Sequence, residues 1–100
     1  TIGDNGGRLI IDTHRRMVKA DGKEVHLTPT EYKLLVTMVR SPDRIFTREQ
    51  LITYALEDAF NGYDRSIDTY IKELRIKIEK DRRKPRFIRT VHGVGYKFTP

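Results

Sequence analysis

Two helix-start signatures lie close together in this chain and constrain its fold more than any other feature. Thr28-Pro-Thr-Glu31 places a capping Thr before a Pro at the first helical position, with an acidic residue three positions after the cap. Thr47-Arg-Glu-Gln50 repeats the pattern with Gln in the last position. Such capping boxes satisfy the N–H groups that the first turn of a helix leaves unpaired. They predict one helix that ends at Ser41-Pro42 and a shorter one that ends near Ala55 or Leu56.

A longer helix and a terminal hairpin are predicted after these two. Asp64 is positioned to cap the third helix, and Pro85 is expected to end it. Phe87–Val91 and Tyr96–Phe98 have the composition of two strands joined by a glycine-containing turn. Apolar residues recur in the third helix at the spacing of one buried stripe: Ile67, Ile71, Leu74 and Ile78.

The first part of the chain predicts an antiparallel sheet of three or four strands. Leu9–Ile11, Met17–Ala20 and Lys23–Leu27 are short runs of strand character. Asp21-Gly22 separates the last two, as in a type I′ turn, which needs positive φ at both central residues. The Gly-rich residues 1–7 are expected to be the remnant of a linker from a longer protein, which leaves residues 8–100 as one domain.

All of the excess positive charge lies in the last part of the chain. Residues 64–100 carry 11 Lys/Arg and 5 Asp/Glu, whereas residues 1–63 carry 9 of each. A basic helix and hairpin attached to a neutral first half indicate a surface that meets a polyanion. Two short helices before a longer basic one are typical of a helix-turn-helix protein. The face opposite the apolar stripe, where base edges would be read, presents Arg65, Thr69, Lys72, Glu73 and Ile76.

Several functions are poorly supported by the composition. The chain has no Cys, which excludes disulfides and thiolate metal sites and fits a cytoplasmic protein. No apolar run approaches the roughly 18 residues that a membrane span needs. His14, His26 and His92 fall on three different predicted elements without the spacing of metal ligands. Glu31 and Glu49 are explained as helix N-terminal residues. We therefore expect neither an enzyme nor a cofactor.

Other interpretations remain open at this stage. The charged helix face and the hairpin residues Arg89 and Lys97 could be ordinary solvated surface, and Ile76 could pack beneath the hairpin or a loop. The glycines Gly93 and Gly95 are better explained by a tight hairpin than by a phosphate-binding loop. The same surface could instead bind a protein, and a general nucleic-acid or RNA binder would carry a similar charge. A metal-dependent hydrolase is the remotest alternative.

In combination, four motifs resemble the C-terminal effector domain of OmpR/PhoB-type two-component response regulators. They are Leu27-Thr-Pro-Thr-Glu-Tyr-Lys-Leu-Leu35, Phe46-Thr-Arg-Glu-Gln-Leu51, Asp64-Arg-Ser-Ile-Asp68 and Thr90-Val-His-Gly-Val-Gly-Tyr96. The resemblance extends over about Leu9 to Phe98. It implies an α+β fold: a winged helix-turn-helix with an N-terminal four-stranded antiparallel sheet, three helices and a C-terminal β-hairpin wing.

The resemblance also implies sequence-specific binding to promoter DNA, with the third helix in the major groove and the wing near the minor groove. A receiver domain, absent from this chain, would control it by phosphorylation. We expect a mainly monomeric domain in isolation that binds direct repeats head to tail. The implied DNA contacts are Arg65, Ser66, Thr69, Tyr70, Lys72, Glu73, Arg75, Ile76, Thr90, His92 and Tyr96. The loop implied to touch RNA polymerase includes Glu57, Asp58, Phe60, Asn61 and Tyr63.

Three residues depart from common variants of this family. Glu73 stands where some relatives have a base-reading Arg, so it would accept from a cytosine amino group or pair with Lys77. His92 stands at the wing tip in place of Arg or Trp; being largely neutral at pH 7, it would attract the minor groove less strongly. Leu56 stands where some relatives place a Trp. The operator sequence, the regulated genes and the sensed signal do not follow from the sequence.

Overall fold

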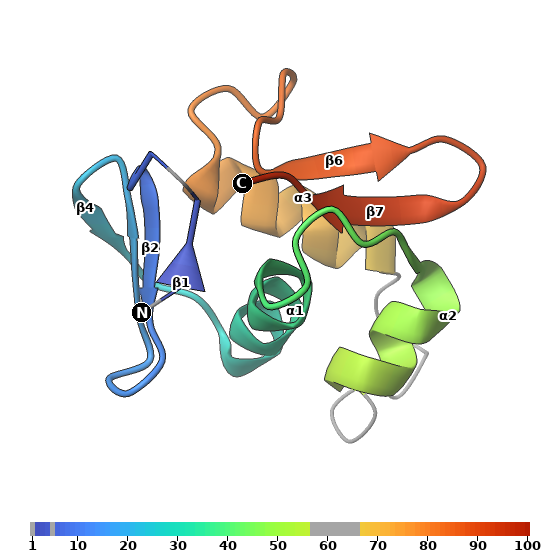
Figure 1. Cartoon of the computed structure of the whole chain (residues 1–100), viewed down its shortest axis with the longest axis horizontal. Coiled ribbons are helices and arrows are strands. Elements are labelled where there is room, and N and C mark those ends of the chain that lie inside the picture. Colours follow the sequence, from blue (N-terminus) through green and yellow to red (C-terminus); the bar gives the residue numbers. More distant parts are fainter. Residues whose placement is uncertain (1, 5, 57–66) are drawn as a thin grey trace.

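The computed structural model describes residues 2–4, 6–56 and 67–100. An N-terminal antiparallel sheet contains four strands in the order β1-β2-β3-β4 (Figure 1). They are β1 (Ile2–Gly3), β2 (Leu9–Asp12), β3 (Met17–Ala20) and β4 (Lys23–Val25). Asp21 and Gly22, between β3 and β4, have φ values of 52° and 80°. The Asp-Gly turn predicted from the sequence is therefore present, and so is the four-stranded sheet.

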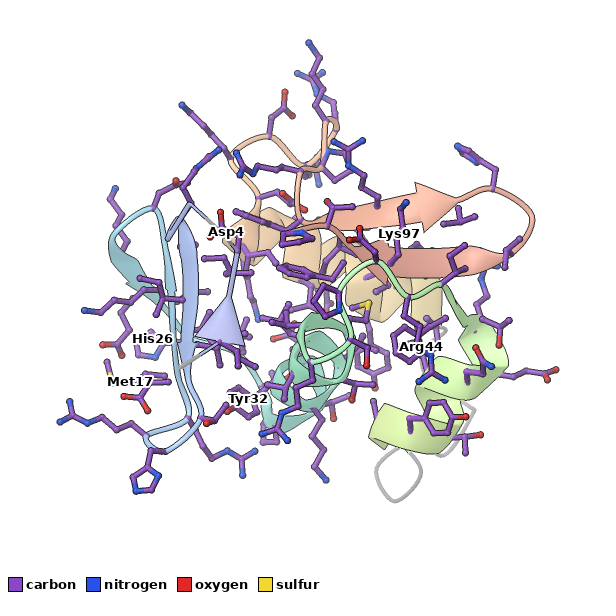
Figure 2. The ribbon with its side chains drawn as sticks, in the orientation of Figure 1. Asp4, Met17, His26, Tyr32, Arg44 and Lys97 are labelled. Carbon is purple, nitrogen blue, oxygen red and sulfur yellow. The ribbon has the colours of Figure 1, made fainter. Side chains whose placement is uncertain are left out.

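The N-terminal segment is more structured than the expected linker remnant. Ile2 pairs with Ile11 as part of β1, so the sheet begins before residue 8. Asp4 is buried, and its carboxylate accepts a hydrogen bond of 2.7 Å from the backbone N–H of Leu9. Arg86 Nη2 lies 3.4 Å from the same carboxylate. Asp4 thus joins the sheet to the segment that follows the third helix (Figure 2).

Both predicted capping boxes are formed. In α1 (Pro29–Val39), the Thr28 hydroxyl accepts from Glu31 N and the Glu31 carboxylate accepts from Thr28 N. In α2 (Arg48–Leu51), Thr47 and Gln50 make the same pair of bonds. A π-helical turn, η1 (Ile52–Leu56), continues α2. The short-range chemistry of the two motifs was therefore sufficient to locate both helix starts.

The third helix, α3 (Ile67–Ile78), buries the predicted stripe but ends earlier than expected. Ile67, Ile71, Leu74 and Ile78 are all at most 2% exposed. The expectation that Pro85 ends the helix is wrong. Residues 80–84 are all charged and exposed. A further helical turn would therefore have no apolar side chain to bury. The predicted cap Asp64 lies outside the described residues.

The C-terminal wing is a three-stranded sheet in the order β5-β7-β6. It contains the predicted hairpin of β6 (Ile88–Val91) and β7 (Gly95–Phe98), together with β5 (Phe46–Thr47), which we did not predict. Gly93 has φ of 78°, as a tight turn requires. Gly95 has a different role: a Cβ there would lie 1.9 Å from the carbonyl oxygen of Phe46. This glycine lets β5 approach β7.

The core lies where α1, α3 and the two sheets meet. Figure 1 shows α1 between the N-terminal sheet and α2, with α3 running behind the wing hairpin. The core combines aromatic side chains from the wing region with aliphatic side chains from the helices. The largest fully buried side chains include Phe46, Phe87, Phe98, Leu34, Leu35, Met38, Ile71 and Leu74. No helix among the described residues is long and apolar enough to cross a membrane.

An ion pair between a buried carboxylate and a partly exposed lysine joins α1 to α3. Lys77 Nζ lies 2.6 Å from Glu31 Oε1, and the Glu31 side chain is 1% exposed. Lys77 was considered above as a partner for Glu73, but its ion pair is with Glu31 instead. Burial raises the pKa of Glu31, but hydrogen bonds from Lys77 and from Thr28 N outweigh this, and the pKa is lowered. The capping carboxylate of α1 therefore also attaches α1 to α3.

This pair predicts a pH-dependent contribution to stability. A carboxyl group whose pKa is lower in the folded state stabilises the fold above its unfolded pKa, here near 4.5, and loses that contribution as the pH falls through the folded value. We expect the stability difference between wild type and Glu31→Gln to be largest near neutral pH and to shrink in acid. Thermal unfolding of both proteins between about pH 7 and pH 3 measures it. Parallel curves would contradict this role of Glu31.

Candidate nucleic-acid interface

The face of α3 opposite its buried stripe carries the candidate reading residues. Lys72 is exposed, and Ile76 is exposed to 51%. Thr69 and Glu73 are half-buried beside them. Ile76 therefore does not pack beneath the hairpin, which was the alternative to an apolar contact with a ligand. Tyr70 is half-buried and packs against the core, so its ring helps to hold α3 in place.

Some predicted site residues lie outside the described residues. They are Arg65 and Ser66 of the implied DNA contacts, and Glu57, Asp58, Phe60, Asn61 and Tyr63 of the implied polymerase loop. The side chain of Leu56 is likewise outside what the structure describes.

Arg75 faces the wing. Its Nε and Nη2 donate to the carbonyl oxygen of Ile88 at 3.1 Å and 2.9 Å, and Nη2 also donates to Thr90 Oγ1 at 2.8 Å. Its guanidinium carbon is 5.5 Å from the centre of the Tyr96 ring. The resemblance implies DNA contacts for Arg75 and Thr90. In the structure the two are bonded to each other, and Arg75 joins β6 to α3.

A second polar cluster joins α2, α3 and the wing. Tyr96 OH donates to Asp68 Oδ1 at 2.5 Å, and Arg48 Nε donates to the same oxygen at 2.8 Å. The Arg48 guanidinium also lies 5.4 Å from the Tyr96 ring centre. The hydrogen bond from Tyr96, followed by that from Arg48, lowers the pKa of Asp68. Burial, followed by the bond to Asp68, raises the pKa of Tyr96, so its hydroxyl remains a donor.

Sequence reasoning did not identify Arg48 and Asp68 as members of this site. Asp68 entered only as the end of a family motif, and Arg48 only as the second residue of a capping box. They are 20 positions apart, so no helical or strand spacing relates them. The only signal in the sequence was that each residue belongs to one of the motifs described above. In the structure, they orient Tyr96, whose side chain is otherwise buried.

The wing tip is open to solvent. His92 is exposed, as are Gly93 and Val94. On the strands behind the tip, Arg89 is exposed and Lys97 is half-buried. The hairpin thus presents cationic side chains on a narrow projection beside α3 (Figure 1). This geometry suits a groove or backbone contact more than a flat protein surface.

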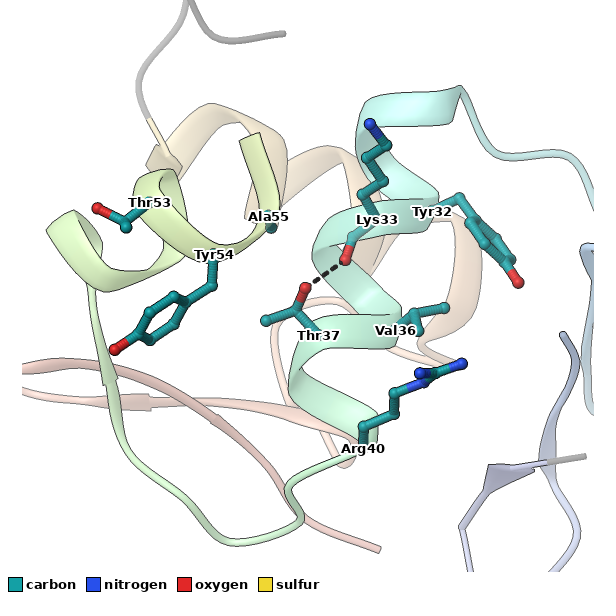
Figure 3. Close-up of a pocket in the computed structure, with 8 residues that line it drawn as sticks. All are labelled: Tyr32, Lys33, Val36, Thr37, Arg40, Thr53, Tyr54 and Ala55. Atoms are coloured by element: carbon teal, nitrogen blue, oxygen red, sulfur yellow. Dashed lines mark hydrogen bonds between the residues drawn. The ribbon is translucent and has the colours of Figure 1, made fainter. Parts of the chain in front are cut away.

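A separate groove lies between α1 and η1, with a volume of about 370 Å³ (Figure 3). Its lining residues come from both helices, and Thr37 of α1 and Tyr54 of η1 lie between them, whereas Tyr32, Val36 and Arg40 extend from the other side of α1. The lining residues that the structure describes include no carboxylate or imidazole to form an acid–base pair. Within the described ranges, no group of His, Cys, Asp or Glu could hold a metal ion.

The fold and this surface define a winged-helix DNA-binding domain. The family model described as "Transcriptional regulatory protein, C terminal" matches residues 22–98. The chain belongs to this family, which comprises the DNA-binding effector domains of OmpR/PhoB-type response regulators. The resemblance seen in the sequence motifs is confirmed.

Curated relatives and solved structures agree with this family. The chain is 43% identical to BaeR of Escherichia coli over 90 residues, covering 90% of this chain and 38% of BaeR. SrrA of Staphylococcus aureus is equally identical, with the same coverage. The response regulator DrrB of Thermotoga maritima matches with a TM-score of 0.85 and 37% identity, over 99% of this chain and 44% of DrrB. The chain thus spans less than half of these proteins.

The solved relatives include complexes with DNA. The DNA-binding domain of RstA from Klebsiella pneumoniae, in complex with the RstA box, matches with a TM-score of 0.80 and 30% identity. The match covers 100% of this chain and 95% of the RstA domain.

Proposed function

We propose that this domain binds double-stranded promoter DNA with α3 in the major groove and the β6–β7 hairpin beside the minor groove. The observation that carries the proposal is the composition of the exposed face of α3, which combines the ammonium of Lys72 with the uncovered side chain of Ile76. A major groove about 12 Å wide admits such a helix. The RstA domain, which has the same fold, is solved in complex with its DNA box, and this supports DNA as the ligand.

The residues on this surface have different proposed roles. Lys72 donates to phosphate or to guanine, and Ile76 and Thr69 contact thymine methyl groups. Glu73 accepts from a cytosine amino group, and His92 lies at the minor groove. Tyr70, Arg75, Thr90 and Tyr96 act mainly by fixing the helix and the wing relative to each other. Arg65 and Ser66 are proposed to contact the DNA backbone.

The proposal for the whole protein is broader. A receiver domain outside this chain controls promoter binding, and two domains bind direct repeats head to tail while the isolated domain is mainly monomeric. Residues 57–63 contact RNA polymerase. The protein acts in the cytoplasm, controls transcription, and has neither a catalytic activity nor a cofactor. The family match supports the statements about DNA binding. The charge distribution also supports them, because all of the excess positive charge lies in residues 64–100.

Selection of binding sites from a random double-stranded DNA pool, with affinities measured at two salt concentrations, tests the proposal. We expect enrichment of a direct repeat with a spacing of about one helical turn. With about four to six phosphates neutralised per domain, the slope of log K against log salt should be roughly −4 to −5. Salt-sensitive binding without an enriched sequence would indicate a general nucleic-acid binder. No binding at low salt would refute the proposal.

Lys72→Ala tests the placement of α3. Loss of one phosphate or guanine contact should weaken binding to the selected site roughly tenfold and make the salt slope shallower by about 1. Lys23→Ala is the matched control, because Lys23 is an exposed lysine on β4 of the N-terminal sheet. Equal effects of the two substitutions would mean that net charge, and not the position of α3, governs binding.

A further inference from the structure

The segment after α3 is held in a defined turn. The Glu79 carboxylate accepts hydrogen bonds from the backbone N–H groups of Arg86, Phe87 and Ile88, which closes the base of the segment. Within it, Lys84 N donates to the carbonyl oxygen of Asp81 at 2.9 Å, and Arg83 N donates to Asp81 Oδ1 at 3.0 Å. Figure 1 shows the resulting loop projecting from the end of α3 beside the wing.

This turn brings two arginines alongside the exposed face of α3. Lys72, Arg75, Arg82 and Arg83 line one shallow hollow of about 280 Å³. Arg82 and Arg83 also line a second hollow with Ile76 and Lys80, whose lining includes the carboxylates of Glu79 and Asp81. Residues that are ten positions apart in sequence, Lys72 and Arg82, are therefore neighbours around one space, and that space borders the surface proposed to read bases. We define these four cationic residues as the basic cradle.

The charge of the basic cradle is largely uncompensated. Its described lining contains four cations and no carboxylate. Among the ion pairs of the described residues, Lys72, Arg75 and Arg82 take part in none, and the pair of Arg83 with Asp81 is an exposed one at 3.7 Å. The polar partners of Arg75 are neutral oxygens. Four like charges around one hollow create a positive potential that an anion relieves.

The side chains of the basic cradle favour a phosphodiester over other anions. Guanidinium groups bind phosphate oxygens through paired N–H donors, and the hollow is open enough for a strand to pass across it. A phosphodiester presents two unesterified oxygens and continues in both directions. Because the cradle shares Lys72 with the exposed face of α3, a strand bordering the major groove that α3 occupies would pass beside it.

We propose that Lys72, Arg75, Arg82 and Arg83 bind a backbone phosphodiester of the operator at the C-terminal end of α3. The proposal rests on the proposed function above and adds a site to it, since Arg82 and Arg83 lie beyond the helix and beyond the implied contacts of the family. The contact contributes to affinity and to the position of α3, but carries no base sequence information.

The double substitution Arg82→Ala/Arg83→Ala tests the basic cradle. We expect affinity for the selected DNA site to fall roughly tenfold or more near 0.1 M salt, with the salt slope shallower by about 1 to 2. The preferred sequence should not change, because phosphate contacts do not read bases. Both side chains are exposed, so the unfolding temperature should remain close to that of the wild type.

Two further variants make the result specific. Lys19→Ala/Lys23→Ala removes the same charge from exposed positions on the N-terminal sheet and should have a much smaller effect. Arg82→Lys/Arg83→Lys keeps the charge and should retain most of the salt slope. If the double alanine variant behaves like the Lys19/Lys23 control, the basic cradle is refuted while the proposed function stands. If the wild type itself fails to bind DNA, both are refuted.

Discussion

Glu79→Ala should lower the midpoint of thermal unfolding by at least about 8 °C. Glu79 is 8% exposed, and its carboxylate is the acceptor for the backbone N–H groups of Arg86, Phe87 and Ile88 at 2.9–3.0 Å. Alanine leaves three donors without an acceptor, two of them buried. At about 1–3 kcal/mol for each of the two buried donors left without an acceptor, the loss is about 2–6 kcal/mol. For a domain of this size, each kcal/mol lowers the midpoint by about 4–8 °C.

The effect is expected to be large because Glu79 organises the passage from α3 to the wing. Phe87 follows directly and is 1% exposed, so its burial depends on the path that the carboxylate sets. Its ring stacks on that of Phe98 with the ring centres 6.3 Å apart. Without Glu79, the backbone of residues 86–88 would have to separate from the core to reach water.

Circular dichroism melts of three variants distinguish this role from a general charge effect. Glu79→Gln retains one acceptor oxygen and should fall between wild type and Glu79→Ala. Glu24→Ala removes an exposed carboxylate on β4 and should change stability by at most about 0.5 kcal/mol. A loss below about 1 kcal/mol for Glu79→Ala would show that water replaces the carboxylate at these three N–H groups.

Arg75→Ala should weaken DNA binding by about 10- to 100-fold and also lower stability by about 2 kcal/mol. Hydrogen bonds from a charged donor contribute about 1.5–3 kcal/mol, and the lost bonds include two to the carbonyl oxygen of Ile88. The loss frees β6 from α3, so the wing and the helix no longer approach DNA in one fixed arrangement. The cradle also loses one of its four charges.

Amide hydrogen exchange separates the positioning role of Arg75 from a plain phosphate contact. If Arg75 holds the wing, the amides of β6 should exchange faster in Arg75→Ala, and Arg75→Lys should restore only part of the protection because an ammonium lacks the planar fork. Thr90→Val removes one of the acceptors and should give a smaller change in the same direction. Unchanged exchange and stability with weakened DNA binding would mean that Arg75 acts only through the phosphate contact of the basic cradle and does not hold the wing.

The elements that sequence reasoning located correctly depend on interactions between near neighbours in the chain. The two capping boxes join residues three positions apart, and the Asp-Gly turn joins adjacent residues. The apolar stripe of α3 follows from helical geometry alone. The errors are at positions where distant segments meet. Strand β5 has two residues and depends on Gly95, where a Cβ would collide with the backbone of Phe46.

For the candidate site, too, some features could be predicted from the sequence and others could not. The basic second half and the exposed face of α3 were visible in the sequence, because net charge and helical period need no tertiary information. The direction of each arginine was not visible. Arg75 and Lys72 lie on the same helix and carry the same charge, yet one donates to Ile88 and Thr90 of the wing while the other is exposed.

By itself, then, the sequence determined the starts of α1 and α2, the turn between β3 and β4, the buried face of α3, the wing hairpin and the location of the excess charge. Only the tertiary structure decided that α3 ends at Ile78, that residues 2–3 belong to the sheet, and that Arg75 supports the wing while Arg82 and Arg83 reach the side of α3. The physical reason is that a long polar side chain takes whichever partner the packed backbone brings within about 3 Å, and that partner is set by segments distant in sequence.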